Sequence, residues 1–281
     1  MTIQTIFDVC VSVTLSLLLV AIFNDDQILN LLIILGQGHF LISYLYTHKA
    51  GKMNSLFRKK FFGLGFIVLG ICLYVFKHQE HLNLLAFFTG VLFIFHYYND
   101  ELKIQGIKRY RFFVLGSLAS MLAFSGVYAN KLFNFSSPLL YILSIASLLV
   151  FFYFSYLAVG IRKNIGNNAF VYVLFFTFLN WAIPTLLISI PSVSVYQIFG
   201  FIILFHYFRW YIYYANIFKD TREPLYFYLK TIFNIHFLLI ALYVQHVLMK
   251  YSTYLVFIFN PIFFYGWTIM HILLSVRKND Y

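Results

Sequence analysis

The stretch IFGFIILFHYFRWYIYY, residues 198–214, decides the fold class of this chain. Its seventeen residues are almost all aliphatic or aromatic, and Arg209 carries its only permanent charge. A run of this length reaches the ~17 to 25 residues that an α-helix needs to cross the ~30 Å hydrocarbon core of a bilayer. The stretch therefore predicts a transmembrane helix, with His206 at its centre.

Apolar runs of the same kind follow one another along the whole chain. Of its 281 residues, 62% are hydrophobic and only 10% are charged, and the mean hydropathy is +0.83. The runs predict spans near residues 5–23, 28–46, 61–76, 83–98, 112–128, 138–158, 169–188, 193–214, 231–247 and 254–276. Three of these are short, so the expected count is nine or ten. We expect an all-α fold, a polytopic transmembrane bundle that forms a single integral membrane domain over residues 1–281.

The distribution of basic residues predicts the orientation of these spans. Sixteen of the twenty Lys and Arg residues fall in segments that share one side of the membrane. These segments are HKAGKMNSLFRKK, DELKIQGIKRYR, IRKN, residues 219–230 and the C-terminal RKND. Because cytoplasmic segments collect Lys and Arg, we expect both termini in the cytoplasm, and a bacterial inner membrane fits best. Anionic headgroups then account for the net charge of +11, and no nucleic-acid partner is expected.

Five histidines are expected at a similar depth in the cytoplasmic half of the membrane. They are His39, His96, His206, His236 and His271, each from a different span. Burying an imidazole in hydrocarbon is unfavourable unless its nitrogens are hydrogen-bonded or bound to a metal. For any one histidine the alternative is a ring that is hydrogen-bonded to a carbonyl. Taken together, the first three predict a shared metal site, and the last two are further candidate ligands.

Polar residues near these histidines suggest supporting roles. Asp100 follows His96 by one helical turn, so its carboxylate can accept a ring proton from a metal ligand. The alternative for Asp100 and its neighbours Asn99 and Glu101 is a solvated helix end. Arg209 can pair with Asp100, but its long side chain is expected to extend to the headgroups instead.

The chain also has features of a packed, aromatic interior. It contains 36 Phe and 23 Tyr, which suits a cavity for a long, flat, apolar ligand, although a coding bias is an alternative explanation. Asn180 is a candidate lining residue. Gly36 and Gly38 allow a helix or a ligand to approach closely. Pro184 and Pro261 lie inside spans, where each is expected to kink its helix and free a carbonyl.

Three segments resemble the histidine motifs of a known enzyme family. GQGHFLISYL at residues 36–45, FIFHYYNDE at 93–101 and FGFIILFHYFRW at 199–210 resemble, in this order, motifs of the Brp/Blh beta-carotene 15,15'-dioxygenases. The resemblance covers roughly residues 30–215. It implies a non-haem iron held by four histidines and an oxidoreductase that uses O2 to split beta-carotene into two molecules of retinal.

The chain departs from this family at one position. Where the family has its fourth histidine, one turn after the third, this sequence has Trp210. An indole cannot replace imidazole as a ligand, so either His236 or His271 completes the site, or three histidines suffice, or the chemistry is lost or altered. Trp210 is also expected to line the substrate cavity, where it would favour a shorter isoprenoid or acyl chain if it narrows the space.

Other functions compete with an iron-dependent oxygenase. The dense histidine clusters of membrane desaturases are absent from the sequence, which argues against that class. A b-type haem protein needs only two histidines on facing helices. The main non-enzyme alternative is a membrane transporter, for which intramembrane carboxylates or an inverted repeat would be expected. The predicted partners of the oxygenase are an apolar polyene, O2 and the lipid bilayer.

Overall fold

The protein is described from a computed structural model. The structure describes residues 3–49, 55–104, 110–131, 137–165, 167–187, 190, 192–250 and 253–275. These residues are almost entirely helical and contain no strand, which confirms the predicted all-α bundle. Much of the first two basic segments, Pro191 and the C-terminal RKND lie outside the described residues.

Each predicted span overlaps a helix. The α-helices are α1 Ile3–Ile22, α2 Asp25–Lys49, α3 Ser55–Lys77, α4 Leu82–Ile104, α5 Tyr110–Lys131, α6 Ser137–Ile165, α7 Asn167–Leu187, α8 Val195–Phe218, α9 Arg222–Leu248, α10 Val256–Phe259 and α11 Pro261–Ser275. Two short 3-10 helices, η1 at Gln79–His81 and η2 at Thr253–Leu255, precede α4 and α10. Helices are expected here because an apolar chain in lipid must satisfy its backbone hydrogen bonds internally.

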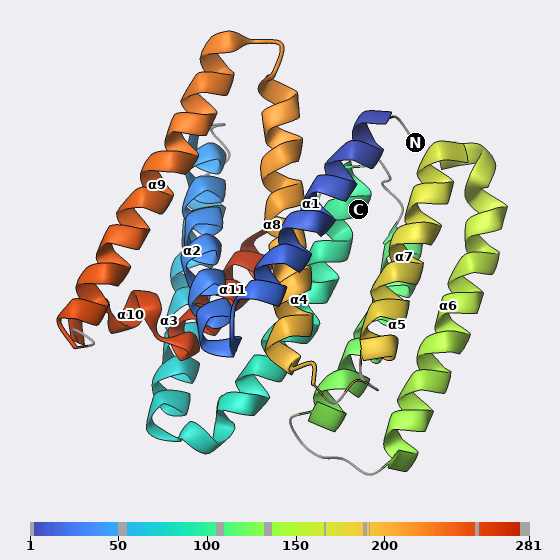
Figure 1. The fold of residues 1–281 in the computed structure, drawn as a ribbon, viewed down its shortest axis with the longest axis horizontal. Coiled ribbons are helices and arrows are strands. Elements are labelled where there is room, and N and C mark those ends of the chain that lie inside the picture. The colour runs from blue at the N-terminus through green and yellow to red at the C-terminus, as the bar shows by residue number, and fades with distance from the viewer. Residues whose placement is uncertain are drawn as a thin grey trace. The chain divides into compact units, whose positions relative to one another are not determined.

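The described helices form two compact units. The first comprises residues up to Cys10 and Gly90–Phe199, and in it α5, α6 and α7 pack against one another. The second comprises Val11–Thr89 and Gly200–Val276, and in it α2 packs on α9 and α11. These neighbours can be followed in Figure 1. The single domain expected from the sequence stays a prediction.

Length and composition support a membrane location. Four segments are long and apolar enough to cross a bilayer, namely Asp25–Tyr46, Lys60–Lys77, Gln79–Leu102 and Arg222–Leu248. The bent pair Thr253–Phe259 and Pro261–Ser275 makes a fifth. Shorter apolar helical segments lie within α1, α6 and α7. The full count of nine or ten spans and their orientation stay predictions.

The outer faces of two helices are apolar, as a lipid environment requires. Only 17% of the apolar segment of α3 and 11% of that of α9 are buried. The exposed side chains are large hydrophobic ones, such as Phe66 on α3 and Phe233 on α9, which are 75% and 67% exposed. An exposed apolar surface of this extent would be unfavourable in water and is stable against acyl chains.

The tenth predicted span is broken at Pro261, which confirms the expected kink. The helical segments before and after it meet at 46°. Asn260 ends the first segment in an extended conformation, and its side-chain oxygen accepts a hydrogen bond from the Ile262 amide at 2.9 Å. Asn260 is therefore the N-cap of α11 and Pro261 its first residue, which is a favoured place for proline. In contrast, α7 continues through Pro184.

The break frees two backbone carbonyl groups, and each accepts a hydrogen bond from a side chain instead. Pro261 has no N–H to offer the carbonyl of Phe257, which instead accepts a hydrogen bond from the Trp267 indole at 3.1 Å. The amide that would reach the carbonyl of Ile258 is turned to Asn260, and Gln37 of α2 donates to that carbonyl at 3.3 Å. The bend thus leaves neither of these backbone acceptors unsatisfied.

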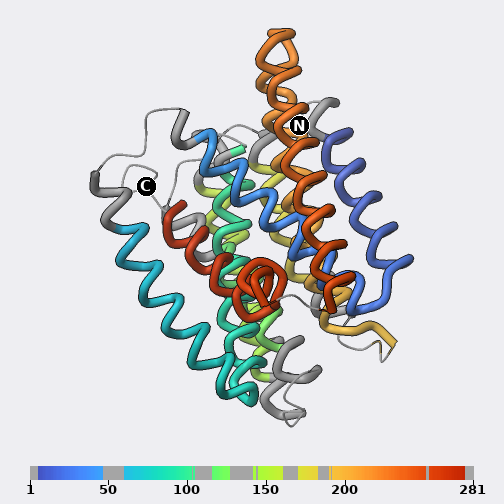
Figure 2. The backbone as a smooth tube through the Cα atoms, turned by 90° about the vertical axis from the view of Figure 1, so that its left-hand side faces the viewer, coloured from blue at the N-terminus to red at the C-terminus, as the bar shows by residue number. Residues whose placement is uncertain are grey.

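A glycine allows α3 and α11 to pack closely. Figure 2 shows the two helices side by side. A Cβ atom on Gly266 of α11 would lie 2.4 Å from the Cys72 sulfur and 3.0 Å from Val68, both on α3. Cys72 is 2% exposed and its thiol donates to the Ile262 carbonyl at 3.5 Å. Even one added methyl group at Gly266 would therefore have to displace the Cys72 side chain or the helix that carries it.

We expect Gly266→Ala to lower the stability of the protein by roughly 1 to 3 kcal/mol, the usual effect of overpacking. Thermal unfolding in detergent measures this. Gly70→Ala is the matched control, because a Cβ atom there meets nothing within 4 Å. Combining Gly266→Ala with Cys72→Ala should restore part of the loss, and equal melting of both single variants would contradict the packing argument.

Candidate metal centre

The side chain of His39 lies within a cluster of aromatic rings in the second unit. It is 1% exposed and packs edge to face against Trp210, with 4.5 Å between the ring centroids. The rings of His206 and His271 contact it edge to face at 5.3 and 5.1 Å. Tyr207 stacks on it at 5.1 Å. These five residues from α2, α8 and α11 form what we call the His39 cluster.

Two glycines bring the neighbouring helices close to α2. A Cβ atom on Gly36 would lie 2.6 Å from both the Tyr207 hydroxyl and a ring carbon of Phe264. A Cβ atom on Gly38 would lie 2.4 Å from Nε2 of His236. Since real Cβ atoms do not approach other atoms so closely, a larger residue at either position would displace the ring that it meets. These close approaches by other helices explain both glycines of the first motif.

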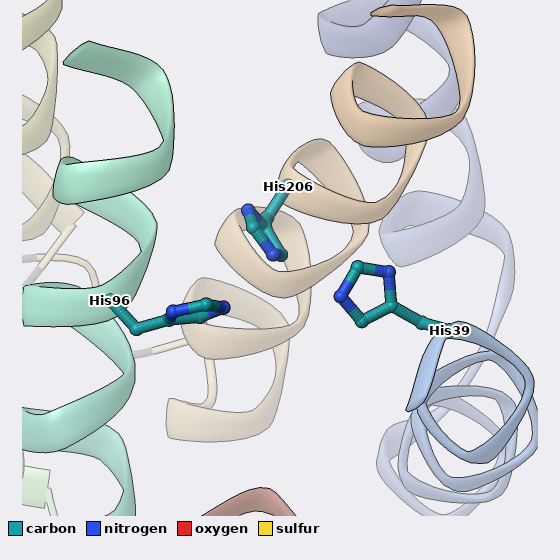
Figure 3. A group of neighbouring side chains, drawn as sticks. All are labelled: His39, His96 and His206. Atoms are coloured by element: carbon teal, nitrogen blue, oxygen red, sulfur yellow. The ribbon is translucent and has the colours of Figure 1, made fainter. Parts of the chain in front are cut away.

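The three histidines that the sequence predicts as metal ligands are all buried, two of them in the second unit and one in the first. His39 and His206 of the second unit are 1% and 2% exposed, and their ring centroids lie 5.3 Å apart. His96 of the first unit is 3% exposed. Figure 3 labels the three side chains, which come from α2, α4 and α8. Imidazole rings without a thiolate are a donor set that fits a transition metal. That the three rings share one ion stays a prediction.

A carboxylate lies beside one of these histidines, as the helical spacing predicts. Oδ2 of Asp100 is 3.3 Å from Nε2 of His96, one turn earlier on α4. The Asp100 side chain is 19% exposed, whereas that of His96 is 3% exposed. A carboxylate next to a buried imidazole favours one tautomer and restrains the ring orientation. Asp100 is therefore placed to orient His96.

The residues around Asp100 do not form a solvated helix end, so that expectation is wrong for them. Glu101 is 1% exposed and Asn99 is 7% exposed. The hydroxyl of Tyr172 on α7 donates a short hydrogen bond to the Glu101 carboxylate at 2.5 Å. A carboxylate at the polar end of an apolar helix resembles a solvated group in sequence, and its partner on α7 gives no signal there.

His236 has hydrogen-bond partners at both ring nitrogens. Nδ1 donates to the Ile232 carbonyl at 2.8 Å, since a carbonyl can only accept. That tautomer leaves Nε2 as an acceptor, and the Tyr211 hydroxyl donates to it at 3.1 Å. This is the alternative considered for a single histidine, a ring bonded to a carbonyl of its own helix.

His271 lies much closer to the predicted ligands. It is 4% exposed, stacks on Phe40 with 4.6 Å between centroids, and contacts the His39 ring at 5.1 Å. Trp210, at the position of the missing family histidine, contacts the same ring. Of the two histidines considered for a fourth ligand, His271 is the one that reaches the His39 cluster.

Two further predicted residues are buried. Arg209 is only 2% exposed, so the expectation that its side chain extends to the headgroups is wrong. A buried guanidinium adds a positive charge to a largely apolar helix, which is tolerated only with polar contacts around it. Asn180 is 5% exposed, and its amide donates to the Phe176 carbonyl of its own helix at 2.8 Å. Its role in a substrate cavity stays a prediction.

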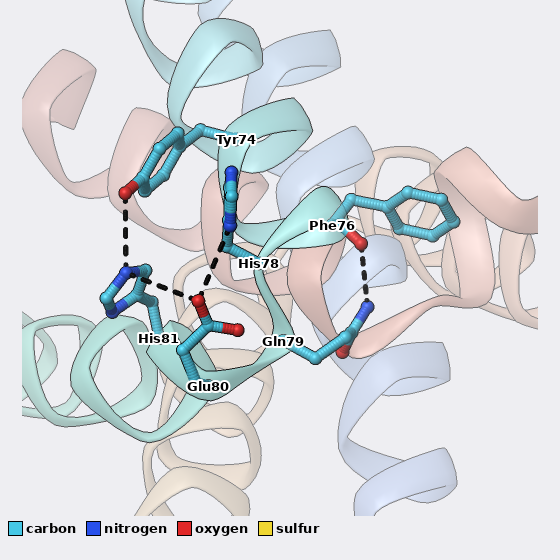
Figure 4. A network of polar contacts seen from close by, with 6 residues as sticks. All are labelled: Tyr74, Phe76, His78, Gln79, Glu80 and His81. Atoms are coloured by element: carbon cyan, nitrogen blue, oxygen red, sulfur yellow. Dashed lines mark hydrogen bonds and ion pairs between the residues drawn. The ribbon is translucent and has the colours of Figure 1, made fainter.

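The HQEH segment that joins α3 and α4 is a surface turn. His78 and His81 contact the same oxygen of Glu80 at 3.4 and 3.9 Å, and all three side chains are at least 40% exposed. Tyr74 also contacts His81, at 3.3 Å, as Figure 4 shows. An exposed carboxylate between two histidines is a common surface arrangement and needs no metal.

Sequence reasoning missed two tyrosines near the histidines. Tyr207 stacks on His39, and Tyr211 contacts the same ring at 6.3 Å while it binds His236. Tyr207 directly follows His206 on α8, and Tyr211 lies one helical turn further on. This i, i+4 spacing was the available signal, but an aromatic-rich sequence offers many such pairs.

No family model, no curated protein and no solved structure matches this chain. The resemblance to the Brp/Blh enzymes therefore rests on the three motifs alone. The function has to be argued from the chemistry of the histidines and their surroundings.

We expect Gly38→Ala to destabilise the protein by roughly 1 to 3 kcal/mol, because the added methyl would displace the His236 ring. The hydrogen bond from Tyr211 would be lost with it. Thermal unfolding in detergent measures the change, and Gly63→Ala, at a position with nothing within 4 Å, is the control. Adding His236→Ala should recover part of the loss. A melting temperature equal to that of the control would show that the close approach is unimportant.

Proposed function

We propose that this chain is a membrane-embedded, non-haem iron oxygenase that oxidises or cleaves an apolar polyene, such as beta-carotene, with O2. The observation that carries the proposal is the burial of His39, His96 and His206 in apolar helices, together with the contact between the rings of His39 and His206. Burying ionisable side chains in an apolar bundle costs free energy, so such residues are rare there and usually mark a functional site. The three motifs around these histidines supply the resemblance to retinal-forming dioxygenases.

The donor set favours a single metal ion. Three neutral imidazoles without a thiolate suit iron, zinc or copper. A haem would need a flat opening between two of the histidines. Trp210, Tyr207, His206 and His271 contact the His39 ring from several directions, which argues for a compact ion instead. Iron(II) with open coordination positions would supply the activation of O2.

The residues of the chain would hold the ion and keep its surroundings dry. His39, His96 and His206 would bind it through ring nitrogens, and Asp100 would restrain the ring of His96. Trp210 and Tyr207 would exclude water on the side of His39. Water exclusion matters because it protects reactive species from side reactions. None of these residues needs to act as an acid or a base.

We infer that His271 takes the place of the family's fourth histidine. Trp210 occupies that position in the sequence and contacts the His39 ring at 4.5 Å. His271 approaches the same ring at 5.1 Å from α11, whereas both nitrogens of His236 are hydrogen-bonded. A ligand moved from α8 to α11 would keep four imidazoles while changing the shape of the cavity.

Elemental analysis of detergent-purified protein tests the metal site. We expect near-stoichiometric iron in the wild type and its loss in a His96→Ala, His206→Ala double variant. His246→Ala is the matched control, since His246 is also buried at 5% exposure but contacts Phe259. A product assay with beta-carotene and O2 then tests the reaction.

Wild-type protein without metal, purified under conditions that retain labile iron, would refute the oxygenase. A haem spectrum would favour the b-type alternative. If the protein holds neither iron nor haem, the transporter alternative is favoured. Glu101 supports it, because this carboxylate is buried in the segment Gln79–Leu102 and transporters are expected to have intramembrane carboxylates.

The fourth ligand has its own test. We expect His271→Ala to lower the iron content or weaken iron binding at least tenfold, which corresponds to about 1.4 kcal/mol. His236→Gln should leave iron binding unchanged, because its role is to hydrogen-bond Tyr211. Titration of the apo-protein with iron(II) measures both. The reverse order of effects would assign the fourth ligand to His236.

A further inference from the structure

An apolar cavity lies between α3 and the broken helix α10–α11. Its volume is about 240 Å³, well above the roughly 150 Å³ of an apolar cavity that can hold benzene. Six aromatic rings line it, those of Phe61, Phe62, Phe66, Phe257, Phe263 and Trp267. Among the described residues that line it, none carries a charge.

The cavity opens on an exposed, apolar side of the second unit, where lipid is expected. Phe62 and Phe66 on α3 are 64% and 75% exposed, and Phe257 on the opposite wall is 50% exposed. Only 17% of this segment of α3 is buried. A molecule that enters from this side comes from the hydrocarbon region, so it must present an apolar chain there. Aromatic walls favour a flat, conjugated chain, because rings stack on its face.

A series of packed rings lies between the cavity and the His39 cluster. Phe61 of the cavity wall contacts Tyr44 at 6.0 Å between centroids. Tyr44 contacts His271 at 5.9 Å, and His271 contacts His39 at 5.1 Å. Met270, which precedes His271 on α11, lines the cavity itself. Met side chains are flexible, so this wall can adjust without moving a helix.

We propose that this cavity is the lateral entrance of the enzyme, where a conjugated polyene from the bilayer binds before its chain reaches the histidines. The inference rests on the proposed function for the identity of its ligand. It adds a binding site on α3, α10 and α11, which lies outside the three histidine motifs. One helix, α11, carries both Met270 at the entrance and His271 at the cluster.

Filling the cavity tests the proposal. A Cβ atom on Gly65 would lie 3.8 Å from the Met270 sulfur, an ordinary contact, so Gly65→Leu can fill the space without a clash at the backbone. Gly70→Leu is the matched control on the same helix, where a Cβ atom meets nothing within 4 Å. The probe is all-trans-retinol, whose binding to full-length protein in nanodiscs is followed by energy transfer from tryptophan.

We expect wild type and Gly70→Leu to bind retinol alike, and Gly65→Leu to bind it at least tenfold more weakly. Competition by beta-carotene, and much weaker competition by a saturated phosphatidylglycerol, is expected if the site prefers a polyene. Equal binding by all three proteins, or equal competition by the saturated lipid, would overturn the proposal. If Gly65→Leu does not fold, Phe257→Ala replaces it, since this change removes an exposed ring from the opposite wall.

The iron content separates this inference from the proposed function. Gly65→Leu should retain the iron of the wild type, because the substitution lies in the cavity and not at the ligands. If all variants contain iron and Gly65→Leu binds retinol as tightly as the wild type, the entrance is refuted and the oxygenase proposal stands. If Gly65→Leu weakens retinol binding but the wild type contains no iron, the oxygenase proposal is refuted and the cavity is a binding site for apolar molecules.

Discussion

The close approach of other helices to the Gly-rich turn of α2 is the constraint on which the second unit depends. Side chains from α8, α9 and α11 occupy the space that a Cβ atom on Gly36 or Gly38 would need. Between these glycines, Gln37 donates to a carbonyl of the broken helix. His39 follows at once and inserts among the same helices. One turn of helix therefore determines both the packing and the surroundings of the histidine.

Much of the fold was readable in the sequence because the membrane simplifies the problem. A long apolar run must become a helix in lipid, and each of the ten predicted spans overlaps one. Pro261 predicted its break for an equally general reason, the missing N–H. The bounds of the two compact units had no such signal, because contacts among apolar helices depend on shape more than on residue type.

The candidate site was only partly predictable. The three histidines were identifiable because imidazoles are conspicuous in apolar runs, and the i, i+4 spacing placed Asp100 beside His96. The burial of Glu101 and Arg209 was not identifiable, since a charge near the end of a span looks solvated when its neighbours are unknown. Likewise, the stacking of Tyr207 on His39 depends on which faces of α2 and α8 meet.

The break before α11 has a further consequence for how the protein meets its membrane. Straightening it would sacrifice the hydrogen bonds from Trp267 and Gln37. A straight helix would regain only one bond in return, from the Ile262 amide to the Ile258 carbonyl, because Pro261 has no N–H to offer Phe257. In hydrocarbon, where no water replaces a lost bond, the bent form is strongly favoured. The angle of 46° between the two segments is thus determined by these hydrogen bonds and not by bilayer thickness. A thicker or thinner membrane is met by tilting the bent pair as a whole or by deforming the bilayer, because the two segments do not straighten against each other.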